Sequence, residues 1–276
     1  MAYQHLVPTS GRTVGSRQHH GRQHREVPIR VDQATAAGTG HRNEDRAETG
    51  SGWALVLDGA SEHPQVRTGC VHGVSWLVDQ LRTQLAAALG RGDGWSLPVL
   101  TAEAIAATRD QHSACDLANP DSPSATLAIV RADGDSVEIL VLGDCAVVLA
   151  HQDGTVRAVT DDRVERLPGG RPYSLELVRE HRNRLGGFWV ASTAPDAAHQ
   201  AVSTTVPRAA LRSVHLVTDG VTRLVSGFGW SWEQLATALS SEGPGQVINQ
   251  VRQLERAQPL PRGKPHDDAT AVRVRL

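Results

Sequence analysis

Aspartates that follow apolar segments are the residues of this sequence best placed to carry out chemistry. Asp58 ends the apolar run 53–57, and Asp219 comes just after the run 214–217. A carboxylate at the end of a buried strand needs a cation or hydrogen-bond donors, because an unpaired buried charge is very costly. Two acidic pairs extend the set, one after the first predicted strand and one directly before the last: Glu44-Asp45 and Asp267-Asp268.

These carboxylates favour a particular class of metal. Hard oxygen ligands, without a histidine or cysteine cluster close in sequence, favour Mg²⁺ or Mn²⁺ over zinc. The same acids are also compatible with helix caps, turns and surface positions, so this alternative stays open on the residues alone. Other Asp-Gly pairs, at Asp133 and Asp153, separate alternating segments and predict hairpin turns.

Signatures of covalent catalysis and nucleotide binding are absent from the sequence. It has no G-x-S-x-G, no H-E-x-x-H and no P-loop, since Gly263-Lys264 is followed by proline. Cys70 with His72, and Cys115 with His112, lie too close in sequence to indicate catalytic dyads. We interpret these cysteines as buried or incidental thiols.

Composition narrows the class of protein. The 276 residues carry a formal net charge of −2, with 39% hydrophobic residues, which gives no electrostatic reason to expect nucleic acid or membrane partners. The three cysteines form no C-x-x-C motif and indicate reduced thiols. No secretory signal and no apolar run long enough to cross a bilayer is evident, so we expect a soluble, cytoplasmic protein.

The hydrophobic pattern predicts the elements that position the carboxylates. Residues 1–25 are polar and predicted to be a disordered tail, and 26–276 a single α+β domain. Apolar periodicity predicts helices over 71–89, 98–115, 172–184, 232–239 and 246–256. Strands are predicted near 27–34, 53–57, 125–131, 137–142, 146–151, 156–159, 214–217 and 269–276. The three from 125 to 151 are predicted to form a β-meander, and the turn Asp153-Gly154 leads from it to 156–159.

Six short motifs, in this order, resemble those of the metal-dependent protein phosphatases of the 2C type, the PPM family. The similarity runs from about residue 32 to the C-terminus. The motifs are Asn43-Glu-Asp45, Val56-Leu-Asp-Gly59, Ser124-Ala-Thr126, Leu142-Gly-Asp-Cys145, Val217-Thr-Asp-Gly220 and Asp267-Asp-Ala-Thr270.

The resemblance implies a fold and a metal centre. The fold is a four-layer α-β-β-α sandwich of two antiparallel sheets flanked by helices. Asp58 would bridge two Mn²⁺ or Mg²⁺ ions, and Asp219 and Asp267 would complete the coordination of one of them. Supporting positions are implied for the Gly59 carbonyl, for Glu44 and Asp45 through water, and for Asp144 at a weaker third metal.

The sequence departs from the family pattern around the substrate. The phosphate-binding arginine expected four residues before Glu44 is Gly40, and Arg42 or Arg46 are the candidate replacements. The Asp-Gly motif continues as Ala60-Ser-Glu-His63, where His63 could act as a general acid or lie in a surface loop. In the Gly-Asp-Ser-Arg turn of the family, this sequence has Cys145 and Ala146 in place of serine and arginine. In the terminal Asp-Asn-x-Thr motif, Asp268 replaces asparagine and keeps an oxygen acceptor.

The sequence therefore predicts a metal-dependent serine/threonine phosphoprotein phosphatase, with Asp58, Asp219 and Asp267 at its catalytic centre. Two alternatives remain. One is a phosphatase-like regulatory or binding module with weak or no turnover, and the other is a hydrolase of small phosphoesters. The sequence does not indicate the phosphoprotein substrate or the oligomeric state.

Overall fold

Two stacked antiparallel sheets form the centre of the molecule. The computed structural model describes residues 27–39, 42–60, 66–170, 172–260 and 264–276. Sheet A has the order β2-β3-β4-β5-β8, comprising Arg46–Thr49, Trp53–Gly59, Ala125–Asp133, Ser136–Leu142 and Val202–Pro207. Sheet B has the order β1-β10-β9-β6-β7, comprising Arg30–Ala36, Ala269–Arg275, Leu211–Val217, Ala146–His151 and Val156–Thr160.

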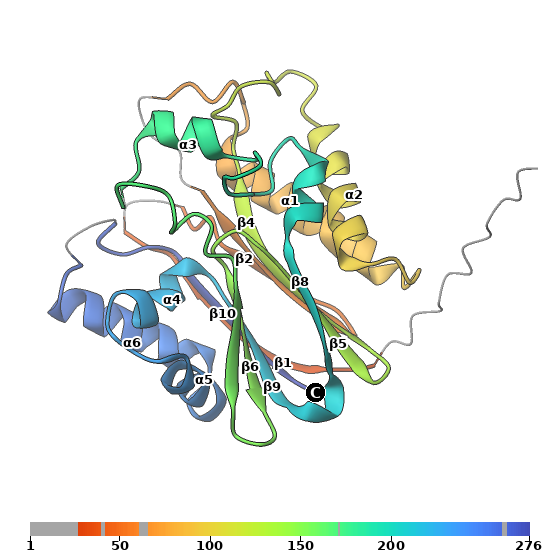
Figure 1. The fold of residues 1–276 in the computed structure, drawn as a ribbon, viewed down its shortest axis with the longest axis vertical. Helices are drawn as coiled ribbons and strands as arrows, with labels where there is room; N and C mark the ends of the chain where they lie inside the picture. The colour runs from red at the N-terminus through yellow and green to blue at the C-terminus, as the bar shows by residue number, and fades with distance from the viewer. Residues whose placement is uncertain (1–26, 40–41, 61–65, 171, 261–263) are drawn as a thin grey trace, which may run out of the picture.

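Helices cover the outer face of each sheet, which completes four layers (Figure 1). On sheet A they are α1, Gly73–Gly90, and α2, Leu97–Arg109. On sheet B they are α4, α5 and α6, spanning Asp219–Ser226, Trp232–Ser241 and Pro244–Ala257. Smaller helices lie in the connections: α3, Leu175–His181, and the 3-10 turns η1, Pro195–Gln200, and η2, Arg208–Ala210. The predicted α-β-β-α sandwich is confirmed.

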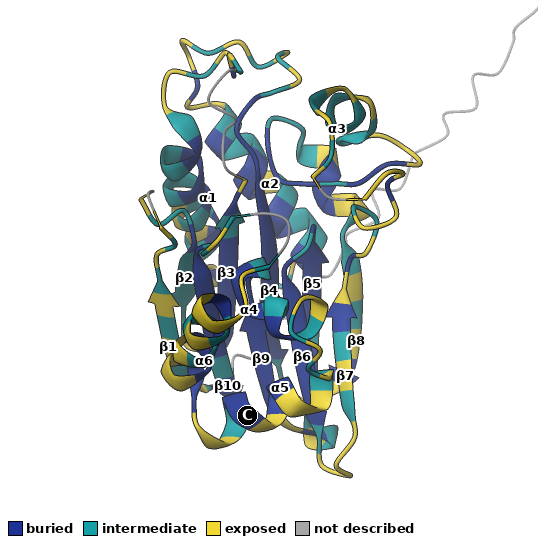
Figure 2. Ribbon diagram, turned by 90° about the vertical axis from the view of Figure 1, so that its left-hand side faces the viewer, coloured by how far each residue is buried: buried dark blue, intermediate teal, exposed yellow. Residues whose placement is uncertain are grey.

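The core has separate layers because side chains alternate along each strand. In β3, Leu55 and Leu57 pack against α1 and α2, whereas Ala54 and Val56 point between the sheets. Both faces of the strand are covered, so its sequence is continuously apolar. Figure 2 shows the central strands as largely buried, which holds Asp58 on a rigid frame at the end of β3.

The predicted meander over 125–151 is wrong in one pairing, that of its second strand with its third, although all three strands are present. β5 pairs with β4 and β8, whereas β6 pairs with β7 and β9 in the other sheet. The chain changes sheets at Gly143, whose φ of +82° suits glycine and whose missing Cβ leaves room for the side chain of Thr126. This crossing places Asp144 between the two sheets.

Several boundaries also differ from the prediction. Strands β2 and β8 were not predicted, because both lie at an edge of sheet A and carry mixed polar sequence. The second helix ends at Arg109, beyond which the chain turns, with the Cys115 N–H bonded to the His112 carbonyl. The predicted tail lies outside the described residues. In the described part of the chain, no helix has the length and apolar character needed to cross a bilayer.

Candidate active site

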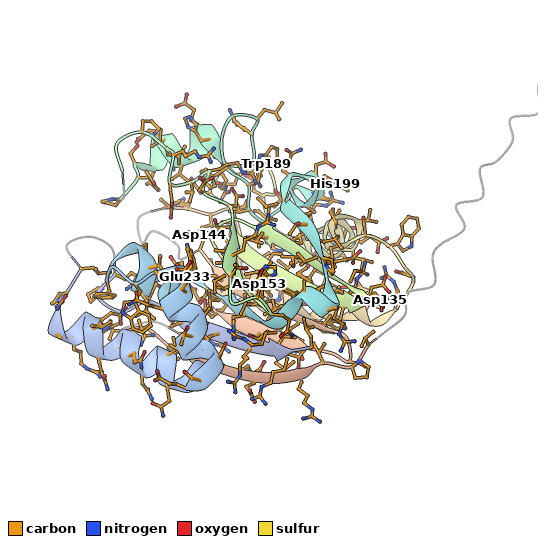
Figure 3. The ribbon with its side chains drawn as sticks, turned by 60° about the horizontal axis from the view of Figure 1, so that its bottom comes forward. Asp135, Asp144, Asp153, Trp189, His199 and Glu233 are labelled. Atoms are coloured by element: carbon orange, nitrogen blue, oxygen red, sulfur yellow. The ribbon has the colours of Figure 1, made fainter. Side chains whose placement is uncertain are left out.

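The acidic residues singled out in the sequence converge at one edge of the two sheets. Asp58 is near the end of β3, Asp219 begins α4 directly after β9, and Asp267 precedes β10. Asp144, labelled in Figure 3, lies in the turn between β5 and β6, and Asp45 precedes β2. These five carboxylates come from distant parts of the chain, and both sheets are needed to assemble them.

Asp58 is at the electrostatic centre of this set. Loss of hydration raises its pKa well above the ordinary range, and the neighbouring carboxylates raise it further, in the order Asp219, Asp45, Asp144 and Asp267. The backbone N–H of Asp219 faces its Oδ2 at 3.4 Å. A carboxylate surrounded by four others is stabilised in its charged form by a bound cation, as a metal site requires.

Asp45 is buried, with 2% of its surface exposed, and only one of its oxygens is satisfied. The Thr218 hydroxyl donates to Oδ2 at 2.8 Å, whereas Oδ1 has no hydrogen-bond partner. Burial, opposed by the hydroxyl contacts and reinforced by Asp219 and Asp268, raises the pKa of Asp45 to about 8. A buried orphan oxygen facing other carboxylates fits a bound cation or its water shell.

Asp267 and Asp268 are neighbours with different partners. Asp268 accepts the backbone N–H of Gly38 at 2.7 Å on Oδ1 and that of Glu44 at 2.6 Å on Oδ2. It therefore holds the segment that carries Glu44 and Asp45 against sheet B. Sequence reasoning did not assign this role to Asp268, because it depends on two N–H groups more than 220 residues away in the chain.

Two cations already contact Asp267. The Arg223 guanidinium donates to its Oδ2 at 2.7 Å, and the Lys264 ammonium to its Oδ1 at 2.9 Å. Burial lowers the pKa of Lys264, but Asp267, Asp58 and Asp219 together outweigh that effect and raise it. A metal ion bound by Asp267 would therefore compete with Lys264 for the same oxygen.

Glycines at the two Asp-Gly motifs are required by close packing. A Cβ on Gly59 would lie 2.5 Å from Val74 Cγ1 and 2.9 Å from the Glu44 Cβ. A Cβ on Gly220 would collide with the Asp268 carbonyl. The backbone of each motif thus lies against another acidic segment, at Glu44 for Gly59 and at Asp268 for Gly220.

Of the two candidate substrate-binding arginines, Arg46 lies near Asp45 and Asp268 and is already engaged. Arg46 donates from Nε to Asp79 Oδ1 at 2.7 Å and from Nη1 to the carbonyls of Asn43 and Asp45, both at 2.7 Å. Arg42 is exposed. The positions of Gly40 and His63 lie outside the described residues.

The donor set fits divalent cations with a preference for oxygen. Asp58, Asp219, Asp267 and Asp144 offer carboxylates, Asp45 offers an oxygen without a partner, and the Gly59 backbone approaches Glu44 closely. Oxygen-only ligation is typical of Mg²⁺ and Mn²⁺. These residues could hold such ions, and their assignment as ligands stays a prediction.

Comparison with known families decides the classification. The sequence model of the family described as protein phosphatase 2C matches residues 33–256, which is most of the chain. The chain belongs to the protein phosphatase 2C family. No curated protein matches it in a sequence search.

Solved structures of the protein phosphatase 2C family share the fold. The serine/threonine phosphatase PstP/Ppp of Mycobacterium tuberculosis is 19% identical, with a TM-score of 0.56 covering 90% of this chain and 98% of that one. Stp1 of Staphylococcus aureus is 17% identical, with a TM-score of 0.56 over 92% of this chain and 98% of that one. A structure of the PstP catalytic domain holds two manganese ions, at 19% identity, a TM-score of 0.54 and coverages of 90% and 97%.

Proposed function

We propose that this protein phosphatase 2C member removes phosphate from phosphoserine or phosphothreonine in proteins, using two Mn²⁺ or Mg²⁺ ions. The observation that carries the proposal is the convergence of Asp58, Asp219, Asp144 and Asp267 around one point, with the pKa of Asp58 raised by burial and by the others. The two manganese ions in the PstP structure support the same metal requirement.

Different residues of the chain would hold the cations, accept a proton and contact the substrate phosphate. Bound divalent cations supply Lewis acidity and a hydroxide nucleophile near neutral pH. Asp58, Asp219 and Asp267 would hold the cations, and Asp45, fixed by Thr218, would accept a proton or a hydrogen bond at its unpartnered Oδ1. Arg42, which is exposed and lies two residues before Glu44, is the candidate contact for a substrate phosphate.

Covalent catalysis by a cysteine is disfavoured at this site. Cys145 is fully buried and lies 3.3 Å from the Thr126 hydroxyl. Burial, followed by the charge of Asp58, raises its pKa well above the ordinary range, so the thiolate is not available. Direct attack on phosphorus without a phosphoenzyme therefore fits the residues present.

A regulatory module with weak or no turnover is the second candidate. Asp267 is held by both Arg223 and Lys264, and Arg46 is engaged by Asp79. Those ion pairs would stabilise a form without metal, and they favour this reading over a third one, hydrolysis of small phosphoesters.

Hydrolysis of a phosphothreonine peptide in the presence of Mn²⁺ tests the proposal. We expect turnover that EDTA abolishes and that Asp219→Asn lowers by roughly a hundredfold or more, since a ligand to the cations is lost. Asp153→Asn is the matched control, because Asp153 lies in the exposed β6–β7 turn and contacts only Thr155 there.

The outcomes separate the candidates. Mn²⁺ binding by calorimetry without turnover on any phosphopeptide would favour the regulatory module. Faster hydrolysis of small phosphoesters than of phosphopeptides, with the same dependence on Asp219, would favour the third reading. No binding of Mn²⁺ at all would contradict the assignment of the carboxylates as ligands.

A further inference from the structure

Two cysteines and two histidines meet at a second place in the molecule. The side-chain ligand atoms of Cys70, His72, His112 and Cys115 all lie within 4.8 Å of one another. The two Sγ atoms are 3.6 Å apart, and His72 Nδ1 is 3.7 Å from Cys70 Sγ and 3.3 Å from Cys115 Sγ. His112 Nδ1 is 3.6 Å from Cys70 Sγ.

Four of the six separations match the edges of a metal-centred tetrahedron. Zinc bonds of about 2.3 Å to sulfur and about 2.0–2.1 Å to nitrogen set ligand separations of about 3.8 Å for two sulfurs and about 3.6 Å for sulfur and nitrogen. The observed distances of 3.6 Å and 3.3–3.7 Å lie close to both values. Four side chains thus surround a space of the size that one zinc ion occupies.

The surroundings hold the four side chains in this arrangement. The His72 N–H points at Cys70 Sγ at 3.4 Å, a contact that favours a thiolate. The Asp116 N–H bonds to the Gly69 carbonyl at 2.9 Å, and Asn119 Nδ2 to the Arg67 carbonyl at 3.0 Å. These two hydrogen bonds join the segment before Cys70 to the segment after Cys115.

An indole covers the histidine rings. Trp76, in the first turn of α1, stacks on His72 with ring centroids 4.1 Å apart and meets the edge of His112 at 4.4 Å. These contacts fix the orientation of both imidazoles, and His112 is buried. A ligand set held by packing and by backbone contacts needs little rearrangement to bind an ion.

We propose that Cys70, His72, His112 and Cys115 bind one structural zinc ion. Two thiolates and two imidazoles are soft and borderline ligands, which select zinc over Mg²⁺ or Mn²⁺. Four protein ligands close the tetrahedron and leave no position for substrate, so the ion stabilises structure and does no chemistry. The site is separate in chemistry from the oxygen ligands around Asp58.

The proposed zinc site lies between the two loops that connect β3 to α1 and α2 to β4. Cys70 follows Gly59, the end of β3, by 11 residues, and Cys115 precedes Ala125, the start of β4, by 10, and Gly59 and Ala125 are paired. The ion would therefore tie together the two loops that leave the Asp58 end of sheet A. It would restrain both connections beside the candidate active site.

A disulfide between Cys70 and Cys115 is the competing explanation. It would use the two sulfurs at 3.6 Å, but it gives no role to the two imidazoles directed at them. Zinc uses all four groups. The two explanations predict different metal contents and different thiol counts.

Metal analysis of the full chain, purified under reducing conditions without chelators, tests the proposal. We expect about one zinc per chain that survives dialysis against Mg²⁺. Cobalt in its place should give the intense visible bands of a tetrahedral ion and a thiolate-to-cobalt charge-transfer band. Cys115→Ser and His112→Gln should each lose at least roughly tenfold in zinc affinity.

Two controls locate the ion. Cys145→Ala removes the thiol outside the cluster, and Asp219→Asn alters the carboxylate centre; both should keep the cobalt spectrum. Absence of zinc together with absence of the cobalt bands in the folded wild type would overturn the proposal. So would a mapped Cys70–Cys115 disulfide under these conditions, or loss of the zinc in Asp219→Asn.

Discussion

Both side-chain oxygens of Asp268 are used as hydrogen-bond acceptors. Each accepts a backbone N–H from the segment 38–44. The family pattern has asparagine at this position. An asparagine amide has one accepting oxygen, and its NH₂ group would face the second N–H donor. The carboxylate at Asp268 is therefore matched to this chain's own loop.

Asp268→Asn is accordingly expected to destabilise the protein although it imitates the family residue. Leaving one part-buried N–H without an acceptor should lower the free energy of unfolding by about 1 kcal/mol. Urea denaturation in EDTA measures this, with Asp135→Asn in the exposed β4–β5 turn as the matched control. Equal stability of the two variants would mean that the pair of N–H contacts contributes nothing.

Sequence reasoning located individual acids better than their partners. Asp58 and Asp219 could be placed at strand ends because an apolar run precedes each of them. The Thr218 contact with Asp45 could not, since 173 residues separate the two. The Cys/His cluster was missed for the same reason: C-x-H and H-x-x-C are short signals, and 40 positions separate His72 from His112.

Among the elements, strands buried on both faces were the most predictable. β3 is apolar without interruption from Trp53 to Leu57, because a helix layer covers one face and the other sheet covers the second. Which sheet each strand joins was not predictable from local pattern. A hairpin and a crossing between sheets both need only a short turn, and Gly143-Asp144 gives no local sign of which occurs.

Strand β9 carries a buried histidine with a consequence for acid stability. His215 is fully buried, with Nε2 at 3.1 Å from the hydroxyls of Ser213 and Ser240. Burial, followed by the charges of Arg273 and Arg212, lowers its pKa to about 3. The neutral ring is thus favoured in the folded protein.

We expect His215 to cost stability as the pH falls. Below about pH 6.5 the His215 imidazole binds a proton in the unfolded chain but stays neutral in the folded chain. Unfolding is therefore favoured progressively down to about pH 3. At about pH 5 the loss should reach roughly 2 kcal/mol. Urea unfolding of wild type and His215→Leu between neutral pH and pH 5 isolates this contribution. Parallel pH profiles for the two proteins would exclude it.

At the scale of the whole molecule, the effect of the acidic cluster on the stacking of the two sheets depends on whether a cation is bound. Asp58 belongs to sheet A, and Asp219 and Asp267 adjoin strands of sheet B. Without a cation their repulsion opposes the stacking of the sheets. With one, the same carboxylates would bridge them, so metal binding and global stability are linked.

This linkage predicts a pH dependence for the metal-free protein. The folded state holds a proton on Asp45 up to about pH 8, whereas the unfolded chain releases it near 3.8. Between those values Asp45 binds more protons in the folded state, which makes stability in EDTA fall as the pH rises. His215 opposes this effect below about pH 6.5, so the fall should be seen between about pH 6.5 and about pH 8. Thermal unfolding with and without Mn²⁺ should show a larger gain in Tm from Mn²⁺ at alkaline pH, where no proton is displaced.

Asp45→Asn provides the control for this profile. It removes the titrating group, and the fall in stability between about pH 6.5 and about pH 8 should become smaller in EDTA. A wild-type protein whose stability in EDTA rises between about pH 6.5 and about pH 8 would contradict the raised pKa of Asp45.

Lys264 allows the carboxylate site to be followed by chemical modification. It is the only lysine in the chain, and its ammonium lies against Asp267. An amine-directed reagent therefore has a single side-chain target in the molecule, next to a candidate metal ligand. Apart from acylation of the α-amino group, each acyl group added to the intact protein marks modification of the Lys264 ammonium. The rate of this acylation therefore measures how accessible the ammonium is beside Asp267.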